Sequence, residues 1–119
     1  MIRIVDVRKL RTAEQRAEVC YVGRAFAGWP ESLWMNPFRV VNGDIEGCLS
    51  RFREYANGWA RGGNLRDWLG ELWESCQHGA KPLGCWCINA THGDGHPVRC
   101  HAQILAEMLH ARFVEDAGV

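Results

Sequence analysis

The chain has 119 residues, of which 47% are hydrophobic, and its 14 basic and 14 acidic side chains give a net charge of zero. A chain of this length is expected to form a single domain over residues 1–119 with its own core. The balanced charge gives no strong signal for nucleic-acid or membrane binding. The N-terminus has no apolar export segment and no run of about 18 apolar residues occurs, so we expect a cytoplasmic protein with reduced cysteines.

The first part of the chain is predicted to supply two strands. Apolar and polar residues alternate in part from Ile2 to Val7, and β-branched and aromatic residues dominate from Val19 to Gly23. Between these strands, Thr12 and Gln15 have the spacing of a capping box, which predicts a short helix over residues 12–18.

Residues 25–43 are rich in glycine, proline and asparagine and are predicted to form a long loop. Two interpretations of this loop remain open. Trp34 could stack on a base or sugar while Asn36 supplies a bidentate amide, or the loop could cover the edge of the sheet. A fourth, short strand is predicted over Phe38 to Val41.

Two amphipathic helices are predicted next. The first begins after Asn42 or Asp44 and runs to about Trp59, and the second begins after Asn64 and ends near Gly79. Their apolar faces, which include Cys48 and Cys76, are expected to pack in the core.

Cysteine and histidine concentrate between Leu83 and Leu109. A strand over Pro82 to Ile88 would place Cys85 and Cys87 on one face, because successive side chains of a strand alternate. The apolar period that follows predicts a helix with Cys100 and His101 in its first turn. The strand end and the helix start are therefore expected to converge on one site.

The first hypothesis for this site is zinc. Cys85, Cys87, Cys100 and His101 provide a Cys₃His ligand set, although twelve residues between Cys87 and Cys100 are not a common finger spacing. His92 or His96 could replace His101.

The second hypothesis is catalytic. Cys100 at a helix N-terminus would be a reactive thiol, with His101, His92 or His96 as its base. The same helix start could bind a phosphate whose oxygens pair with Arg24 and Arg99. The remaining alternative is that the thiols are ordinary buried side chains.

The predicted fold is a small α/β domain with three to four strands packed against about three helices, for which a Rossmann-like arrangement is one option. Gly23 and Arg24 at a strand end fit a ligand crevice of such a fold.

Four motifs occur in order: Tyr21-Val22-Gly23-Arg24, Trp34-Met35-Asn36-Pro37-Phe38, Leu83-Gly84-Cys85-Trp86-Cys87 and Cys100-His101. Together they resemble the domain-of-unknown-function family 4326, over Val5 to about Leu109. Met35 stands where that family usually has Gly, and the segment between Cys87 and Cys100 is longer than usual. A fainter similarity connects the Cys85 to His101 pattern with the uncharacterised family 488.

The resemblance implies a small intracellular protein of phage or bacterial origin, which would work in the host cytoplasm if a phage encodes it. It supplies no reaction. The function we expect is an accessory protein that binds a small nucleotide-like or phosphate-bearing ligand at the Cys/His site, with metal- or thiol-dependent chemistry. The alternative is a non-enzymatic protein with a structural zinc site, which docks on a host protein through the surface from Trp29 to Phe38.

Overall fold

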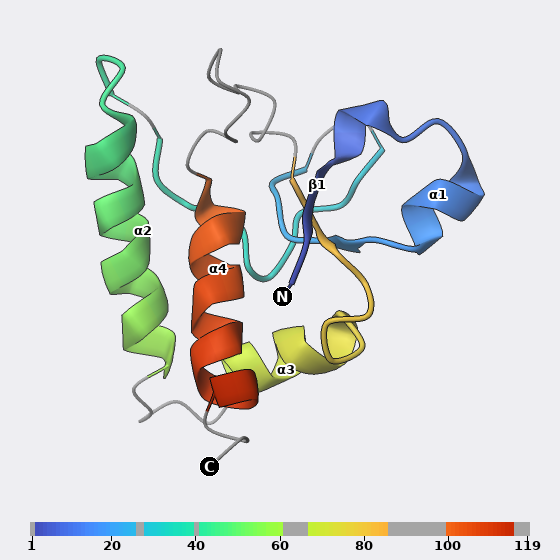
Figure 1. The fold of residues 1–119 in the computed structure, drawn as a ribbon. Helices are drawn as coiled ribbons and strands as arrows, with labels where there is room; N and C mark the ends of the chain where they lie inside the picture. The colour runs from blue at the N-terminus through green and yellow to red at the C-terminus, as the bar shows by residue number, and fades with distance from the viewer. Residues whose placement is uncertain (1, 26–27, 40, 61–66, 86–99, 116–119) are drawn as a thin grey trace, which may run out of the picture.

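The computed structural model describes residues 2–25, 28–39, 41–60, 67–85 and 100–115 (Figure 1). Within them lies a three-stranded parallel sheet in the order β1-β3-β2, formed by β1 (Ile4–Asp6), β3 (Leu83–Cys85) and β2 (Cys20–Tyr21). The central strand, β3, pairs Leu83 with both Ile4 and Cys20. The α/β class predicted from the sequence is confirmed, whereas a Rossmann-like arrangement stays a prediction.

The strands are shorter than predicted. After Asp6 the chain turns into the 3₁₀ helix η1 (Val7–Lys9), because the Asp6 carboxylate accepts a hydrogen bond from the backbone N–H of Arg8 at 3.0 Å. Val22 follows β2 but still donates to the carbonyl of Gly84 at 2.9 Å. The strand predicted over residues 38–41 is wrong for its described residues, none of which is in a strand. Of the segment Pro82 to Ile88, residues 86–88 lie outside the described part.

Gly84 allows the centre of the sheet to pack closely. A Cβ atom at this position would collide with the side chains of Val19 and Val7, which approach the central strand from its two neighbouring segments. Only glycine lacks that atom. The strand that carries Cys85 therefore depends on Gly84 for its place between β1 and β2.

The described residues also contain four α-helices. They are α1 (Ala13–Ala17), α2 (Ile45–Ala60), α3 (Trp68–Ser75) and α4 (His101–Leu109), and α4 continues as the π-helical turn η3 (His110–Glu115). The capping box predicted for α1 is present, with Thr12 and Gln15 exchanging bonds at 3.1 Å. Asp67 caps α3, and the residue predicted for that role, Asn64, lies outside the described residues.

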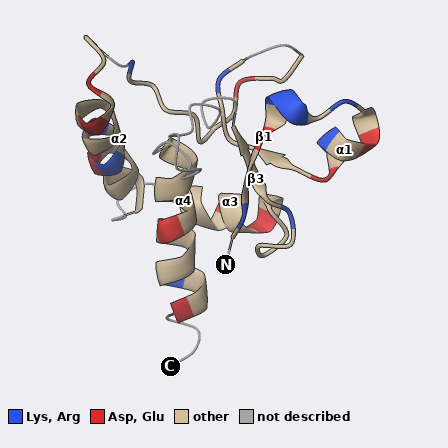
Figure 2. Cartoon of the chain, turned by 45° about the horizontal axis from the view of Figure 1, so that its top comes forward, with Lys and Arg blue, Asp and Glu red and all other residues tan. Residues whose placement is uncertain are grey.

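The helices form layers. In both views α4 lies between α2 and the strands, and α1 lies on the other side of the strands (Figures 1 and 2). α3 packs against α2 and α4. Basic and acidic residues both occur on α2 and α1 (Figure 2). None of the helices in the described ranges has the length and apolar character needed to span a membrane.

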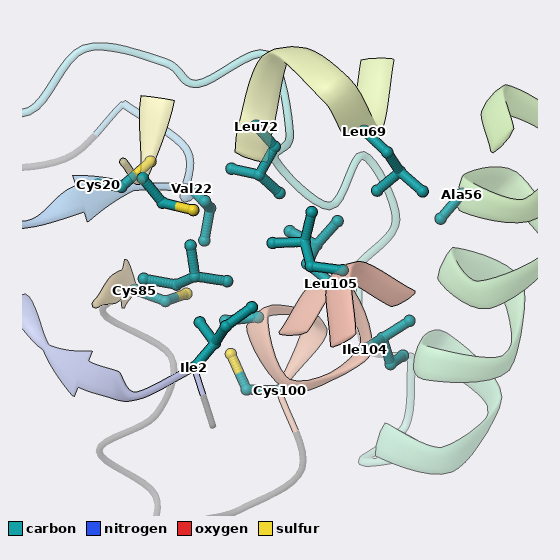
Figure 3. Packing of buried hydrophobic residues seen from close by; sticks show 14 of the residues in the cluster. Ile2, Cys20, Val22, Ala56, Leu69, Leu72, Cys85, Cys100, Ile104 and Leu105 are labelled. Atoms are coloured by element: carbon teal, nitrogen blue, oxygen red, sulfur yellow. The ribbon is translucent and has the colours of Figure 1, made fainter. Parts of the chain in front are cut away.

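The core fills the space between α4, α3 and the sheet (Figure 3). Leu105 of α4, Leu72 of α3 and Leu83 of β3 are fully buried there, and Ala56 of α2 meets the same cluster. Cys85 and Cys100 belong to this cluster, so the candidate site is built into the core.

Candidate metal centre

Three of the predicted site residues come together at the junction of β3 and α4. Cys85 is the last residue of β3, Cys100 is the N-cap of α4, and His101 is the first residue of that helix. Cys100 has an extended backbone (φ −134°, ψ 150°), and its N–H donates to Oε1 of Gln103 at 2.8 Å. This capping bond marks the start of the helix at Cys100, where the sequence predicts it.

The distances among the three side chains match a metal coordination sphere. Nδ1 of His101 lies 3.8 Å from Sγ of Cys85 and 3.8 Å from Sγ of Cys100, and the three ligand atoms all lie within 4.8 Å of one another. Two ligands on a tetrahedral zinc ion, one sulfur and one nitrogen, are separated by about 3.6 Å. The group can therefore hold a metal ion with only small movements of its side chains.

The orientation of His101 directs Nδ1, the nitrogen that could bind a metal, toward the two thiols. Nε2 lies 2.7 Å from the carbonyl oxygen of Val22, and because a carbonyl only accepts, Nε2 carries the proton. In the neutral ring Nδ1 then presents its lone pair, and it faces the two thiols. Metal-binding histidines commonly have this second hydrogen bond, which fixes the ring and its tautomer.

The surroundings also hold the ring in place. The edge of the imidazole packs against Phe52 of α2, with ring centroids 5.2 Å apart and planes at 81°. Val22 is tied to β3 through Gly84, so its carbonyl keeps a constant position relative to Cys85. The exposed fractions of Cys85, Cys100 and His101 are 1%, 2% and 5%.

A groove of about 450 Å³ runs between α2 and α4 and reaches this group at Cys100. Across it, the guanidinium of Arg53 pairs with the carboxylate of Glu107 at 3.1 Å. The residues that line it are mainly polar: Glu46, Leu49, Ser50, Arg53, Cys100, Gln103, Ile104 and Glu107. No motif in the sequence indicates this groove, because it depends on the angle between two helices.

The model of a protein family described as a domain of unknown function (DUF4326) matches residues 5–111. The chain belongs to this family. The resemblance inferred from the four motifs is thereby confirmed. No curated protein and no solved structure matches the chain.

Other predicted site residues of the DUF4326 domain form a separate network in the loop after β2. The Arg24 guanidinium donates to the backbone carbonyl of Asn36 at 2.8 Å and to that of Phe38. The Asn36 side-chain oxygen accepts from the N–H of Phe38 at 2.9 Å. Trp34 donates from its indole nitrogen to the carbonyl of Trp68 at 2.9 Å. These bonds hold the loop against α3, and Trp34 and Phe38 pack against the core cluster.

Four further residues named for the site lie outside the described residues: Cys87, His92, His96 and Arg99. Their predicted roles as metal ligands, bases or phosphate contacts stay predictions.

A second pair of cysteines in the DUF4326 domain, Cys20 and Cys76, has thiols whose pKa is raised by burial. Burial raises the pKa of Cys20 to about 11, with a further upward contribution from Cys76 and an opposing one from Lys81. Burial also raises the pKa of Cys76. Neutral thiols of this kind behave as small apolar side chains, as predicted for Cys76.

Proposed function

We propose that the DUF4326 domain binds Zn²⁺ through Cys85, Cys100 and His101, and that the bound ion forms one end of a ligand site in the groove between α2 and α4. One observation carries the proposal, which is the gathering of Nδ1 of His101 and two sulfurs within 4.8 Å of one another. The hydrogen bond from Nε2 of His101 to Val22 directs the unprotonated Nδ1 toward both sulfurs. That bond alone would also satisfy a histidine that only filled the core.

Zinc fits the chemistry of these ligands. Thiolate and imidazole are the donors that zinc prefers in proteins, and hard cations such as Mg²⁺ prefer oxygen. Two thiolates also neutralise the two positive charges of the ion. The three ligands are only 1% to 5% exposed, and burying net charge costs free energy. A neutral metal centre therefore fits this site best.

The fourth coordination position decides between the two uses of such a site. A fourth protein ligand, for which Cys87 is the sequence candidate, would give a closed structural centre. Three protein ligands would leave one position for water or a ligand, as catalytic zinc sites do. The contact between Cys100 and the groove supports the open form.

The groove favours the nucleoside part of a nucleotide-like ligand. Glu46 and Glu107 are hydrogen-bond acceptors that suit amino and hydroxyl groups, and among the described groove residues only Arg53, which pairs with Glu107, is positively charged. A phosphate would meet two carboxylates here, so its charge would need Arg99 or another arginine. We therefore propose that base or sugar, and not phosphate, occupies the groove.

The second candidate is a structural zinc site in a protein that docks on a host protein through the surface from Trp29 to Phe38. The burial of the three ligands favours it, as does the bonding of Trp34 to α3, which makes the loop a fixed surface. In this case metal loss would unfold the domain, and no small ligand would bind in the groove.

Metal analysis of protein purified without a polyhistidine tag tests the zinc site. We expect about one zinc ion per chain in the wild type and in Cys48→Ser, a buried thiol outside the group. Cys100→Ser should lose most of the metal. A wild-type zinc content far below one per chain would remove the proposal.

Calorimetric titration of the zinc-loaded protein with adenosine and with AMP tests the groove. The proposal expects binding that weakens about tenfold or more in Glu107→Gln, with the zinc content unchanged, because one of the two acceptor oxygens becomes an amide donor and the negative charge is lost. If the protein contains zinc but binds neither adenosine nor AMP, the result would favour the second candidate, a structural zinc site.

A further inference from the structure

We propose that Cys85 and Cys100 also form a redox-active dithiol, in which peroxide oxidises Cys100 first and Cys85 then closes a disulfide. The inference concerns the same side chains as the zinc site but does not depend on the ion. It therefore stands or falls separately from the metal proposal.

The two sulfurs are close and come from separate elements. They lie within 4.8 Å of each other, and Figure 3 shows them facing the same interior region beside Ile2. A disulfide bond is roughly 2 Å long, and a change of side-chain rotamer covers a gap of this size. The bond would join the end of β3 to the start of α4, closing the chain between them.

Each sulfur has a proton acceptor. Nδ1 of His101 is 3.8 Å from both sulfurs, which places it close enough to receive a thiol proton as the sulfur reacts. The imidazolium that results keeps its bond to Val22.

Access to the groove determines which of the two cysteines is oxidised first. Cys100 lines the groove between α2 and α4, whereas the residues lining that groove do not include Cys85. A small oxidant entering the groove therefore meets Cys100. The Cys100 thiolate attacks one oxygen of hydrogen peroxide, the O–O bond breaks, and a sulfenic acid and hydroxide form.

The second step completes the reaction. The Cys85 thiolate attacks the sulfenic sulfur, the S–O bond breaks, and a second hydroxide leaves. The two thiol protons, one held in turn by His101, convert both hydroxides to water. In total two thiols and one peroxide give one disulfide and two waters, so the electrons balance.

Cys20 and Cys76 provide an internal comparison. Burial raises the pKa of Cys20 to about 11 and also raises that of Cys76, so both remain protonated at neutral pH. A protonated thiol reacts slowly with peroxide. Selective oxidation at Cys85 and Cys100 would thus reflect their local chemistry and not general exposure to oxidant.

Disulfide mapping tests the inference. Metal-free wild-type protein is treated with one equivalent of hydrogen peroxide, alkylated, and digested with chymotrypsin and trypsin, which cleave after Trp86 and Arg99. Cleavage after Trp86 separates Cys85 from Cys87. We expect loss of two of the six thiols and a peptide pair that joins Cys85 to Cys100. The reaction should be at least about tenfold slower in urea, where the proximity is lost.

A disulfide through Cys87, oxidation of Cys20 or Cys76 before Cys100, or equal rates in folded and unfolded protein would overturn the inference. The order of attack has its own check with dimedone, which traps sulfenic acids. In Cys85→Ser the label should appear on Cys100, and in Cys100→Ser it should not appear on Cys85. Cys48→Ser should form the disulfide at the wild-type rate. The wild-type mapping remains decisive if either site variant fails to fold.

Discussion

Trp34 and Trp68 hold the long loop against the start of α3 through an exchange of hydrogen bonds. The indole N–H of Trp34 donates to the carbonyl of Trp68 at 2.9 Å, and the indole N–H of Trp68 donates to the carbonyl of Leu33 at 3.2 Å. Trp68 is fully buried, and Trp34 packs against the same core cluster. The loop is therefore part of the folded core.

Trp34→Phe should lower the free energy of unfolding by about 1–3 kcal/mol, because it removes one hydrogen bond and part of a large packed ring. Urea denaturation measures the change. Val41→Ala in the same loop is the matched control, since Val41 is 57% exposed and its truncation should change stability by less than about 0.5 kcal/mol. Equal stability of Trp34→Phe and the wild type would show that the loop contributes little to the fold.

Gly84→Ala should destabilise the sheet by about 1–3 kcal/mol, because the added Cβ collides with Val7 and Val19. Gly58→Ala is the control, and we expect it to change stability in the opposite direction. Gly58 lies inside α2 with no atom near an added Cβ, so alanine there should raise stability by about 0.5–1 kcal/mol. Thermal or urea unfolding of both variants distinguishes a steric effect from a general effect of replacing glycine. A neutral Gly84→Ala would contradict the packing described for β3.

Local signals in the sequence were enough to bring Cys85, Cys100 and His101 together. A short apolar run places Cys85 at a strand end, and the helical period that follows places His101 in the first turn. The end of a strand and the start of the next helix are close in an α/β fold. The two predicted elements are therefore enough to place the three side chains near one another.

Other features depend on tertiary contacts that no local pattern encodes. The acceptor for His101 is the backbone carbonyl of Val22, 79 positions away, and a carbonyl has no sequence signature. The parallel order β1-β3-β2 depends on which segments pair. The early end of β1 reflects the Asp6 side chain binding the next turn, which competes with the alternating pattern.

His101→Gln should separate the metal site from the fold. The glutamine amide can still donate toward the Val22 carbonyl, but it presents no nitrogen at the position of Nδ1. We expect zinc affinity to fall by at least about 100-fold, whereas the metal-free variant keeps its helical circular dichroism. Competition with a zinc-binding dye measures the affinity. His101→Ala, which loses both interactions, should be less stable than His101→Gln without metal, and equal stability would argue against the bond to Val22.

Stability should fall in alkaline solution because of Cys20. Burial raises the pKa of this thiol from its ordinary value of 9.0 to about 11, so the folded protein holds the proton more tightly than the unfolded chain does. The contribution of this protonated thiol to the free energy of unfolding is fully present below pH 9 and is lost as the pH rises toward 11. The full loss amounts to about 3 kcal/mol, because each pKa unit corresponds to about 1.4 kcal/mol. Urea unfolding at pH 8 and pH 10.5, with a reductant present, measures the loss.

Two variants identify the source of that alkaline loss. Cys20→Ala removes the thiol and should show a clearly smaller difference between the two pH values. Ile2→Ala is the matched control, because Ile2 is buried in the same cluster and carries no titratable group. It should be less stable at both pH values and should keep the wild-type difference between them. If Cys20→Ala also keeps that difference, another group causes the loss and the thiol of Cys20 is not the one that titrates.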